Sequence, residues 1–284
     1  MNGKVCMITG ANSGIGKATA KGLAKLGATL ILVCRNKEKG NEALREIKYE
    51  TQNDKIDLLL ADLSSQKSVR DLVSSFKTKY DKLDVLINNA GVYRKKRTLT
   101  EDGVETTFAV NHLAYFLLSN LLLDDLKASS SPRIIIVSSG VERQGKINFG
   151  DLQCEKGYFF GYRAYSQSKL ANVLFTYELA GRLKGTGITV NCLHPGFVRT
   201  NLIWERDKKP LFLRLGTFFI NHFSITPERG AETSVYLASS PEVAEVTGKY
   251  FVNKKEAKSS KESYDESISK RLWEVSAELT KPEP

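Results

Sequence analysis

The chain alternates short, almost wholly apolar runs with longer stretches of helical periodicity, and this alternation most limits how it can fold. Seven runs have the length and the Val, Ile and Leu content of buried strands: residues 4–9, 29–34, 56–61, 85–88, 133–138, 189–193 and 249–252. Helical periodicity separates them at residues 15–26, 37–49, 67–80, 103–123, 162–183 and 228–238. Strands that are apolar throughout are typical of parallel sheets covered by helices on both faces.

This order predicts an α/β fold with a single Rossmann-type, doubly wound parallel sheet of about seven strands and helices on both faces. No linker or repeat interrupts the 284 residues, so we expect one domain over residues 1–284. An apolar segment around 200–226 is expected to form a lid over a hydrophobic substrate, with an ordinary packed helix as the alternative. In the C-terminal tail around 254–284, residues 254–263 are expected to be mobile and 267–279 helical.

The charge and the cysteine content limit which binding partners and which cellular compartment we expect for this protein. The chain has 42 Lys and Arg against 32 Asp and Glu, a net charge of +10 that favours anionic partners. Apart from the basic run at 94–97 these residues are scattered and lack a nucleic-acid-binding motif, so no specific nucleic acid is expected. The four cysteines have no ligand-like spacing, which predicts free thiols in the cytoplasm and no metal site. No apolar run could span a bilayer, although the segment around 200–226 could contact a membrane surface peripherally.

The sequence Thr-Gly-Ala-Asn-Ser-Gly-Ile-Gly at residues 9–16 lies between the first predicted strand and the first predicted helix. Glycines allow a tight turn and a close approach to a pyrophosphate, while the helix N-terminus offers unpaired N–H groups. In this context the motif predicts a dinucleotide site. Its candidate contacts are Gly10, Asn12, Ser13, Gly14, Ile15 and Gly16.

The end of the second predicted strand indicates which dinucleotide is bound. An Asp or Glu about 20 residues beyond the glycines would bind a ribose 2′-hydroxyl, but Arg35 and Asn36 occupy this place. A guanidinium suits a 2′-phosphate, so NADP(H) is favoured over NAD(H), with Lys39 one turn further on as an additional contact. A plain surface arginine is the alternative.

Tyr165 and Lys169 are four positions apart in a predicted helix, so both side chains project from one face. A phenol is a poor base at neutral pH, because its ordinary pKa is about 10. An adjacent ammonium and an oxidised nicotinamide would favour the phenolate, and Tyr165 could then exchange a proton with a carbonyl or alcohol oxygen.

Four motifs in this order resemble the short-chain dehydrogenase/reductase family: the glycine loop, Asn-Asn-Ala-Gly at 88–91, Tyr165 with Lys169, and Pro-Gly at 195–196. Cys-Arg-Asn at 34–36, Tyr-Ser-Gln-Ser-Lys at 165–169 and His-Pro-Gly at 194–196 are similar to its retinol-dehydrogenase-like branch. The resemblance implies that Ser139, Tyr165, Lys169 and Asn111 are catalytic, although a buried structural amide is an alternative for Asn111. It implies further cofactor contacts at Asp62, Leu63, Asn89, Ala90, Gly91, Tyr165, Lys169, Pro195, Gly196, Val198 and Thr200. Helix capping is an alternative for Asp62.

Together these observations predict an NADP(H)-dependent oxidoreductase that interconverts an alcohol and a carbonyl on a small lipophilic substrate, such as a retinoid, a sterol or a long-chain aldehyde. Carbonyl reduction is the expected direction where NADP is mostly reduced. The alternative is a catalytically silent NADP(H)-binding redox sensor or interaction protein. Family habit further implies a homodimer or homotetramer that pairs through the long helices around 103–123 and 162–183. Aromatic residues 158–160 and 162, in the interval between Ser139 and Tyr165, are expected to wall the pocket.

Overall fold

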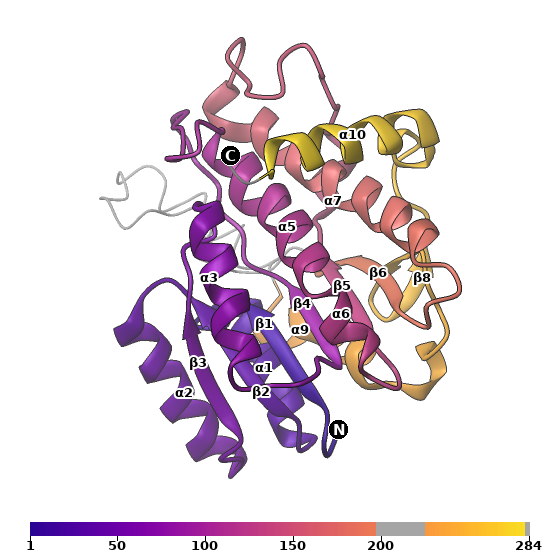
Figure 1. Ribbon diagram of the computed structural model, residues 1–284. Helices are drawn as coiled ribbons and strands as arrows, with labels where there is room; N and C mark the ends of the chain where they lie inside the picture. Colours follow the sequence, from indigo (N-terminus) through magenta and orange to yellow (C-terminus); the bar gives the residue numbers. More distant parts are fainter. Residues whose placement is uncertain (197–224, 282–284) are drawn as a thin grey trace.

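The computed structural model describes residues 1–196 and 225–281, and within them it contains one sheet with the strand order β3-β2-β1-β4-β5-β6-β7-β8 (Figure 1). The strands are β1 (Val5–Thr9), β2 (Thr29–Cys34), β3 (Ile56–Leu60), β4 (Val85–Asn88), β5 (Arg133–Val137), β6 (Thr189–His194), β7 (Lys249–Val252) and β8 (Lys255–Ala257). β1 to β7 pair in parallel, and β8 runs antiparallel to β7. The doubly wound sheet is confirmed, and each of the seven predicted strands agrees with the structure to within one residue at either end.

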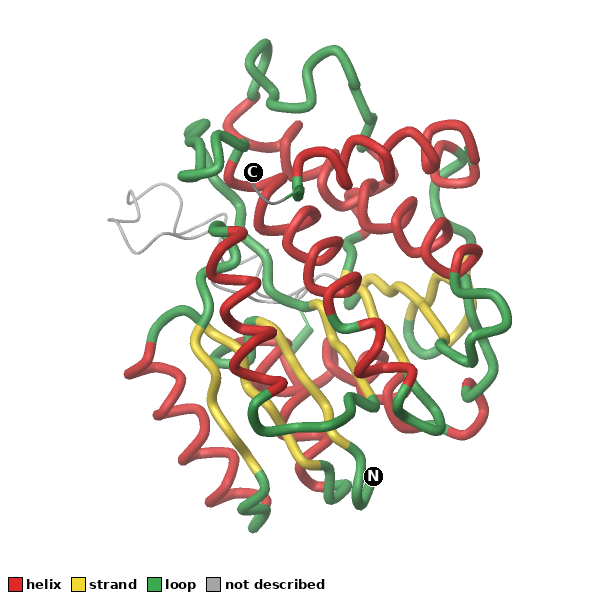
Figure 2. Tube along the Cα trace, in the orientation of Figure 1, coloured by secondary structure: helices red, strands yellow, loops and turns green. Residues whose placement is uncertain are grey.

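Helices cover both faces of the sheet (Figure 2). One face is covered by α1 (Gly14–Lys25), α2 (Lys37–Thr51) and α9 (Pro227–Ser239), and the other by α3 (Gln66–Lys77), α5 (Ala114–Leu121) and α7 (Tyr162–Arg182). Successive strand residues face opposite helical layers, as in β1, where Cys6 and Ile8 pack on one side and Met7 on the other. All three side chains are fully buried. Burial on both sides explains why the strands are apolar throughout.

The segment predicted to be one helix at 103–123 is divided into shorter pieces. It contains α4 (Thr106–Phe108), a π-helical turn η1 (Ala109–Leu113), α5 and, beyond it, α6 (Leu123–Lys127). The helix begins later than predicted because the buried Glu105 carboxylate caps its start by accepting from the N–H groups of Thr107 and Phe108. The π-helical turn bears Asn111, whose side chain bonds a segment distant in sequence. Periodicity cannot report such a contact.

The prediction that residues 254–263 are mobile is wrong. This segment forms β8 and the short 3-10 helix η5 (Glu262–Tyr264). Its backbone is held by the fully buried carboxylate of Glu142, whose two oxygens accept from the N–H of Ser260 at 3.1 and 3.3 Å. Glu142 lies in η2 (Gly140–Gln144), and the remaining 3-10 helices are η3 (Phe159–Gly161) and η4 (Pro241–Val243). The Lys- and Ser-rich composition suggested mobility, but a buried acceptor far away in sequence orders the chain.

The C-terminal helix α10 (Glu266–Leu279) lies against α7 and reaches α5, as the yellow helix of Figure 1 shows. Its Trp273 ring lies 4.8 Å from that of Phe116 on α5 and 6.0 Å from that of Phe175 on α7, measured between centroids. α10 therefore covers part of the surface through which subunits were expected to pair. None of the helices in the described ranges is long and apolar enough to cross a membrane. The expected lid, apart from residues 225 and 226, lies outside these ranges.

Candidate active site

The glycine loop packs closely on itself at the start of α1, where two glycines have no room for a side chain. Gly10 has a φ of +68°, and a Cβ added at Gly16 would lie only 2.3 Å from the carbonyl oxygen of Gly10. The Ser13 side chain, at the N-cap position, makes no capping hydrogen bond, and the first turn of α1 contains no acidic residue. The N–H groups of this turn therefore lack the anionic or side-chain partner that helix starts normally have. These features fit the pyrophosphate of a dinucleotide.

Thr9, the first residue of the glycine motif, is hydrogen-bonded to the residues that follow β4. The Thr9 hydroxyl oxygen accepts from the N–H groups of Asn89 and Ala90 at 2.9 and 3.0 Å, and Asn89 Nδ2 donates to the Thr9 carbonyl at 2.8 Å. The Tyr115 hydroxyl donates to the Ala90 carbonyl at 2.6 Å. Sequence reasoning missed Thr9 and Tyr115 as supporting residues. Thr9 begins the glycine motif and could have been found there, whereas no local pattern identifies Tyr115.

Arg35 follows β2 and lies beside Asp62, which follows the neighbouring strand β3. Arg35 Nη1 is 3.5 Å from Asp62 Oδ2, and 66% of the Arg35 side chain is exposed. Burial would raise the pKa of Asp62, but hydrogen bonds from Ser64 and the charge of Arg35 outweigh it and hold the pKa below its usual value. A long, exposed ion pair of this kind is weak, so the guanidinium could turn to a second anion at little cost.

Asp62 does not cap α3, the helix that follows it. Ser65 caps α3 by accepting from the N–H of Ser68, while Asp62 Oδ1 accepts from the N–H of Ser64 at 2.9 Å, in the turn that precedes the helix. The capping alternative for Asp62 is therefore wrong. Asn36, predicted as a cofactor contact, caps α2 by accepting from the N–H of Lys39 at 2.8 Å.

Ser139, Tyr165 and Lys169 come together at the carboxyl end of β5. Ser139 directly follows the serine that ends the predicted strand, and its hydroxyl lies close enough to the Tyr165 phenol to lower the pKa of that phenol. Lys169 Nζ lies 5.7 Å from the centroid of the Tyr165 ring and donates to the Val137 carbonyl at 3.0 Å. Ser138 points away, donating to the Lys169 carbonyl at 2.7 Å. The opposite directions of the two serines follow from the pleat of the strand.

Burial shifts both titratable groups of this cluster. It raises the pKa of Tyr165 to about 12, against a lowering effect from the Ser139 hydrogen bond. Burial lowers the pKa of Lys169 to about 8. The expected acidification of Tyr165 by its lysine is thus not present in the chain alone, because desolvation of the phenolate raises the pKa of Tyr165. At neutral pH the phenol keeps its proton and the lysine is mostly charged.

Asn111 joins this cluster from the π-helical turn. Its Oδ1 accepts from the Val92 N–H at 2.8 Å, and its Nδ2 donates to the Val92 carbonyl and to the Ser168 hydroxyl, both at 3.0 Å. Both amide hydrogens are therefore used in bracing the chain after β4 against α7. A Cβ added at Gly91 would lie 3.5 Å from Asn111 Oδ1 and 3.7 Å from Lys169 Nζ. Gly91 thus lies next to both groups.

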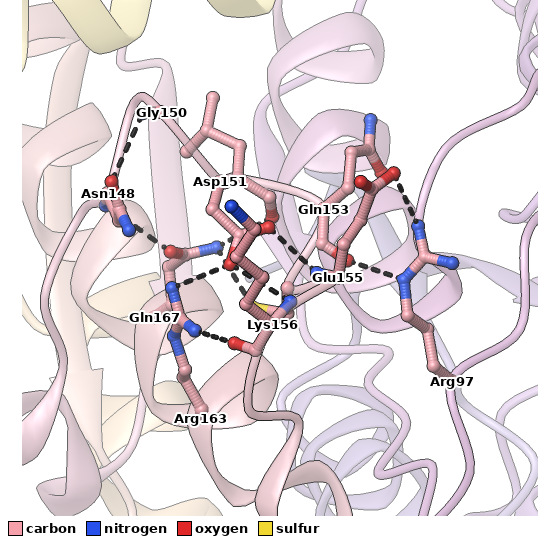
Figure 3. Close-up of polar contacts among 11 residues, drawn as sticks. Arg97, Asn148, Gly150, Asp151, Gln153, Glu155, Lys156, Arg163 and Gln167 are labelled. Atoms are coloured by element: carbon pink, nitrogen blue, oxygen red, sulfur yellow. Dashed lines mark hydrogen bonds and ion pairs between the residues drawn. The ribbon is translucent and has the colours of Figure 1, made fainter.

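The interval between Ser139 and Tyr165 is fastened mainly by polar contacts, which Figure 3 shows. Arg163, two residues before Tyr165 on α7, makes an ion pair with Asp151 at 3.0 Å. Gln167, two residues after Tyr165, donates to the Leu152 carbonyl at 2.9 Å, and Arg97 donates to the Gln153 carbonyl at 2.8 Å. These contacts anchor the start of α7 on both sides of Tyr165. Part of the basic run at 94–97 is used here as a structural tie.

The aromatic residues of the same interval point in different directions. Phe159 and Phe160 are 71% and 84% exposed, with φ values of +45° and +51°. Tyr158 instead turns inward, where its hydroxyl donates to the buried Glu105 carboxylate at 2.9 Å. The polar contacts that fasten this interval accompany these side-chain directions, and the spacing of aromatic residues in the sequence does not reveal them.

The loop after β6 completes the described part of the site. Pro195 and Gly196 follow the strand end, and Gly196 adopts a φ of +85°. Val198 and Thr200 lie outside the described residues, while Leu63 packs beside the core under α3. Over residues 1–196 and 225–281, no group of three or more His, Cys, Asp and Glu residues is placed to hold a metal ion.

This fold and site define a dinucleotide-binding α/β oxidoreductase. The short chain dehydrogenase family model matches residues 4–210. Human retinol dehydrogenase 14 is 45% identical over 97% of this chain and 86% of its own length, and human retinol dehydrogenase 12 is 45% identical over 98% and 86%. The chain belongs to the short-chain dehydrogenase/reductase family, in its retinol-dehydrogenase-like branch, and is an oxidoreductase of alcohol and carbonyl groups.

Solved structures agree with this assignment. An uncharacterized protein from Mycobacterium paratuberculosis superposes with a TM-score of 0.79 at 33% identity, covering 99% of this chain and 95% of its own. A protein from Escherichia coli CFT073, solved in complex with NADPH, has a TM-score of 0.70 at 25% identity, covering 90% of this chain and 98% of its own.

Proposed function

We propose that this chain is an NADP(H)-dependent oxidoreductase acting on a lipophilic alcohol or carbonyl compound of the retinoid, sterol or long-chain aldehyde class. One observation carries the proposal: Ser139, Tyr165 and Lys169 come together at the carboxyl edge of the sheet. Ligands of open α/β sheets bind at this edge. The substrate class is supported by the names of the relatives, which are retinol dehydrogenases.

The cofactor would lie along the carboxyl ends of the central strands. The glycine loop and the start of α1 would hold its pyrophosphate, and Arg35 its 2′-phosphate. Lys169, mostly charged at neutral pH, would bind the ribose next to the nicotinamide. When bound, the nicotinamide supplies or accepts the hydride.

The chain's own side chains handle the proton. In the reductive direction Tyr165 donates its phenolic proton to the carbonyl oxygen as negative charge develops there, while Ser139 donates a hydrogen bond to the same oxygen. The high pKa of Tyr165 ensures that this proton is present at neutral pH. In the oxidative direction the phenol must first lose the proton, which the nearby charges of Lys169 and an oxidised nicotinamide would favour.

NADPH oxidation over a panel of apolar aldehydes and ketones tests the proposal. Replacing Tyr165→Phe should lower turnover by at least about 100-fold and leave NADPH binding unchanged, because only the transferable proton is lost. Tyr49→Phe is the matched control, since Tyr49 is 81% exposed on α2. A parent chain that binds NADPH tightly but reduces none of the panel would instead support the redox sensor.

The cofactor preference has a separate test. Arg35→Asp should shift the ratio of NADPH to NADH efficiency toward NADH by about tenfold or more, because the charge-assisted contact becomes a repulsion. Arg45→Asp makes the same charge change at an exposed position of α2 and should leave the ratio unaltered. A ratio that does not respond to Arg35→Asp would place the 2′-phosphate elsewhere.

Assembly and location follow as predictions of their own. We propose that the enzyme works in the cytoplasm and meets its lipophilic substrate at membrane surfaces, which co-sedimentation with anionic vesicles would test. Pairing of subunits through α5 and α7 would have to accommodate α10, so light scattering of the full chain is the measurement that decides between a monomer and a dimer or tetramer.

A further inference from the structure

His194 ends β6, directly before the Pro195-Gly196 turn, and it belongs to none of the groups assigned above. Its Nδ1 accepts a hydrogen bond from the Gly196 N–H at 3.0 Å. A side-chain acceptor that bonds the backbone N–H two residues further on closes a compact turn, as Asn and Asp do in Asx turns. The ring of Pro195 restricts the backbone between the two ends of this bond.

The turn that His194 closes is a conformation that needs a glycine. Gly196 has a φ of +85°, in the left-handed region that other residues rarely adopt, and a Cβ added there would lie 3.0 Å from Ile225 Cδ1. The hydrogen bond to His194 therefore helps to hold a residue that the family resemblance gives as a cofactor contact.

The same imidazole also lies beside the turn that carries Ser139. A Cβ added at Gly140, the residue after Ser139, would be 3.9 Å from both Cε1 and Nδ1 of His194. On its other side the ring faces Tyr250 of β7, with 6.0 Å between centroids. His194 thus lies between the loop after β6, the turn after β5 and the next strand of the sheet.

We propose that His194 is a positioning residue for hydride transfer: its Nδ1 fixes the Pro195-Gly196 turn, which lies beside the segment bearing Ser139. This inference rests on the proposed function, in which the cofactor lies along the carboxyl ends of the central strands, where both segments begin. The bond requires the neutral tautomer that carries its proton on Nε2, because a protonated Nδ1 cannot accept.

The surroundings of His194 favour this neutral form. Burial and the positive charge of Arg143 on η2 both lower the pKa of His194 below its ordinary value of 6.5. The other titratable groups that face it in the described residues are the Tyr250 phenol on β7 and, beyond Arg143, the buried Glu142 carboxylate, 3.8 Å from Arg143 Nε. The acceptor is therefore available at neutral pH and is lost when acid protonates the ring.

Two substitutions separate the hydrogen bond from the packing. His194→Phe keeps a planar ring between Gly140 and Tyr250 but has no acceptor, whereas His194→Asn loses the ring and places Oδ1 close to the position of Nδ1. We expect His194→Phe to lower the rate of hydride transfer by about fivefold to tenfold, the loss typical of one hydrogen bond. His194→Asn should retain most of the rate.

The readouts distinguish a misplaced nicotinamide from a general structural defect. With NADPH deuterated at the transferred position, His194→Phe should show a larger isotope effect on kcat than the parent, because hydride transfer becomes slower relative to other steps. The dissociation constant of 2′,5′-ADP, which lacks the nicotinamide, should be the same in all three proteins, whereas that of NADPH should rise in His194→Phe. An unchanged isotope effect and NADPH affinity in a folded His194→Phe variant would overturn the proposal.

A pH profile gives a test that does not need the phenylalanine variant. The rate of hydride transfer in the parent should fall as pH drops through the pKa of His194, and His194→Asn should lack this acid limb. The same acid limb in both proteins would refute the role of Nδ1. If the parent binds NADPH but reduces no carbonyl, the proposed function fails, and the comparison of NADPH with 2′,5′-ADP binding still decides the placement of the turn.

Discussion

The buried Lys169 provides a prediction in which stability and activity change in opposite directions. Its ammonium is almost wholly buried, and burial lowers its pKa from the ordinary 10.5 to about 8. The unfolded chain therefore binds a proton more tightly than the folded chain. Since one pKa unit corresponds to about 1.4 kcal/mol, the charged lysine destabilises the fold by about 3 kcal/mol at pH 7. Lys169→Met keeps the apolar stem and removes this cost.

The variant also loses the hydrogen bond from Nζ to the Val137 carbonyl, which offsets about 1 kcal/mol of the gain. The net expectation is a stabilisation of about 2 kcal/mol at pH 7 together with loss of turnover. The cost of burying this lysine should fall to about half by pH 9.5, because the unfolded lysine approaches its own pKa, so the advantage of the variant should shrink as pH rises.

Urea unfolding of the parent and Lys169→Met at pH 7 and pH 9.5 measures both effects. Lys67→Met is the control, because the Lys67 side chain is 82% exposed and its loss should leave stability almost unchanged. A Lys169→Met variant that is less stable than the parent at pH 7, or whose advantage grows with pH, would refute the reasoning from desolvation.

Three further predictions concern the fold around the site. Asp84→Asn should weaken the dependence of stability on pH in acid. Burial raises the pKa of Asp84, but the hydrogen bonds that its carboxylate accepts outweigh burial and hold the pKa below the unfolded value of 3.8. The carboxylate therefore stabilises the fold above pH 3.8 and loses this effect as pH falls below it, which acid titration followed by circular dichroism will show. Gly16→Ala should abolish NADPH binding measured by calorimetry, because its Cβ would meet the Gly10 carbonyl. Trp273→Ala should lower the free energy of unfolding by about 3 kcal/mol in urea titrations, because its ring packs on Phe175; an unchanged midpoint would show that α10 adds little to the stability of α7.

Local sequence patterns determined the sheet and the positions of most site residues. Parallel strands buried on both faces are apolar runs, and their carboxyl ends are adjacent in any doubly wound sheet, so Ser139 and the glycine loop were bound to reach the same edge. The spacing of Tyr165 and Lys169 placed both on one helix face for the same reason: helix geometry is local.

Only the tertiary structure decided the properties that depend on burial and on partners distant in sequence. It raised the pKa of Tyr165 where a neighbouring lysine alone suggested the reverse, because the cost of desolvating the phenolate depends on everything packed around the ring. It ordered residues 254–263 through the buried carboxylate of Glu142, and it brought His194 beside the turn after Ser139. The sequence shows which chemical groups the chain contains, whereas the solvation of these groups and their contacts with distant residues are determined only when the chain has folded.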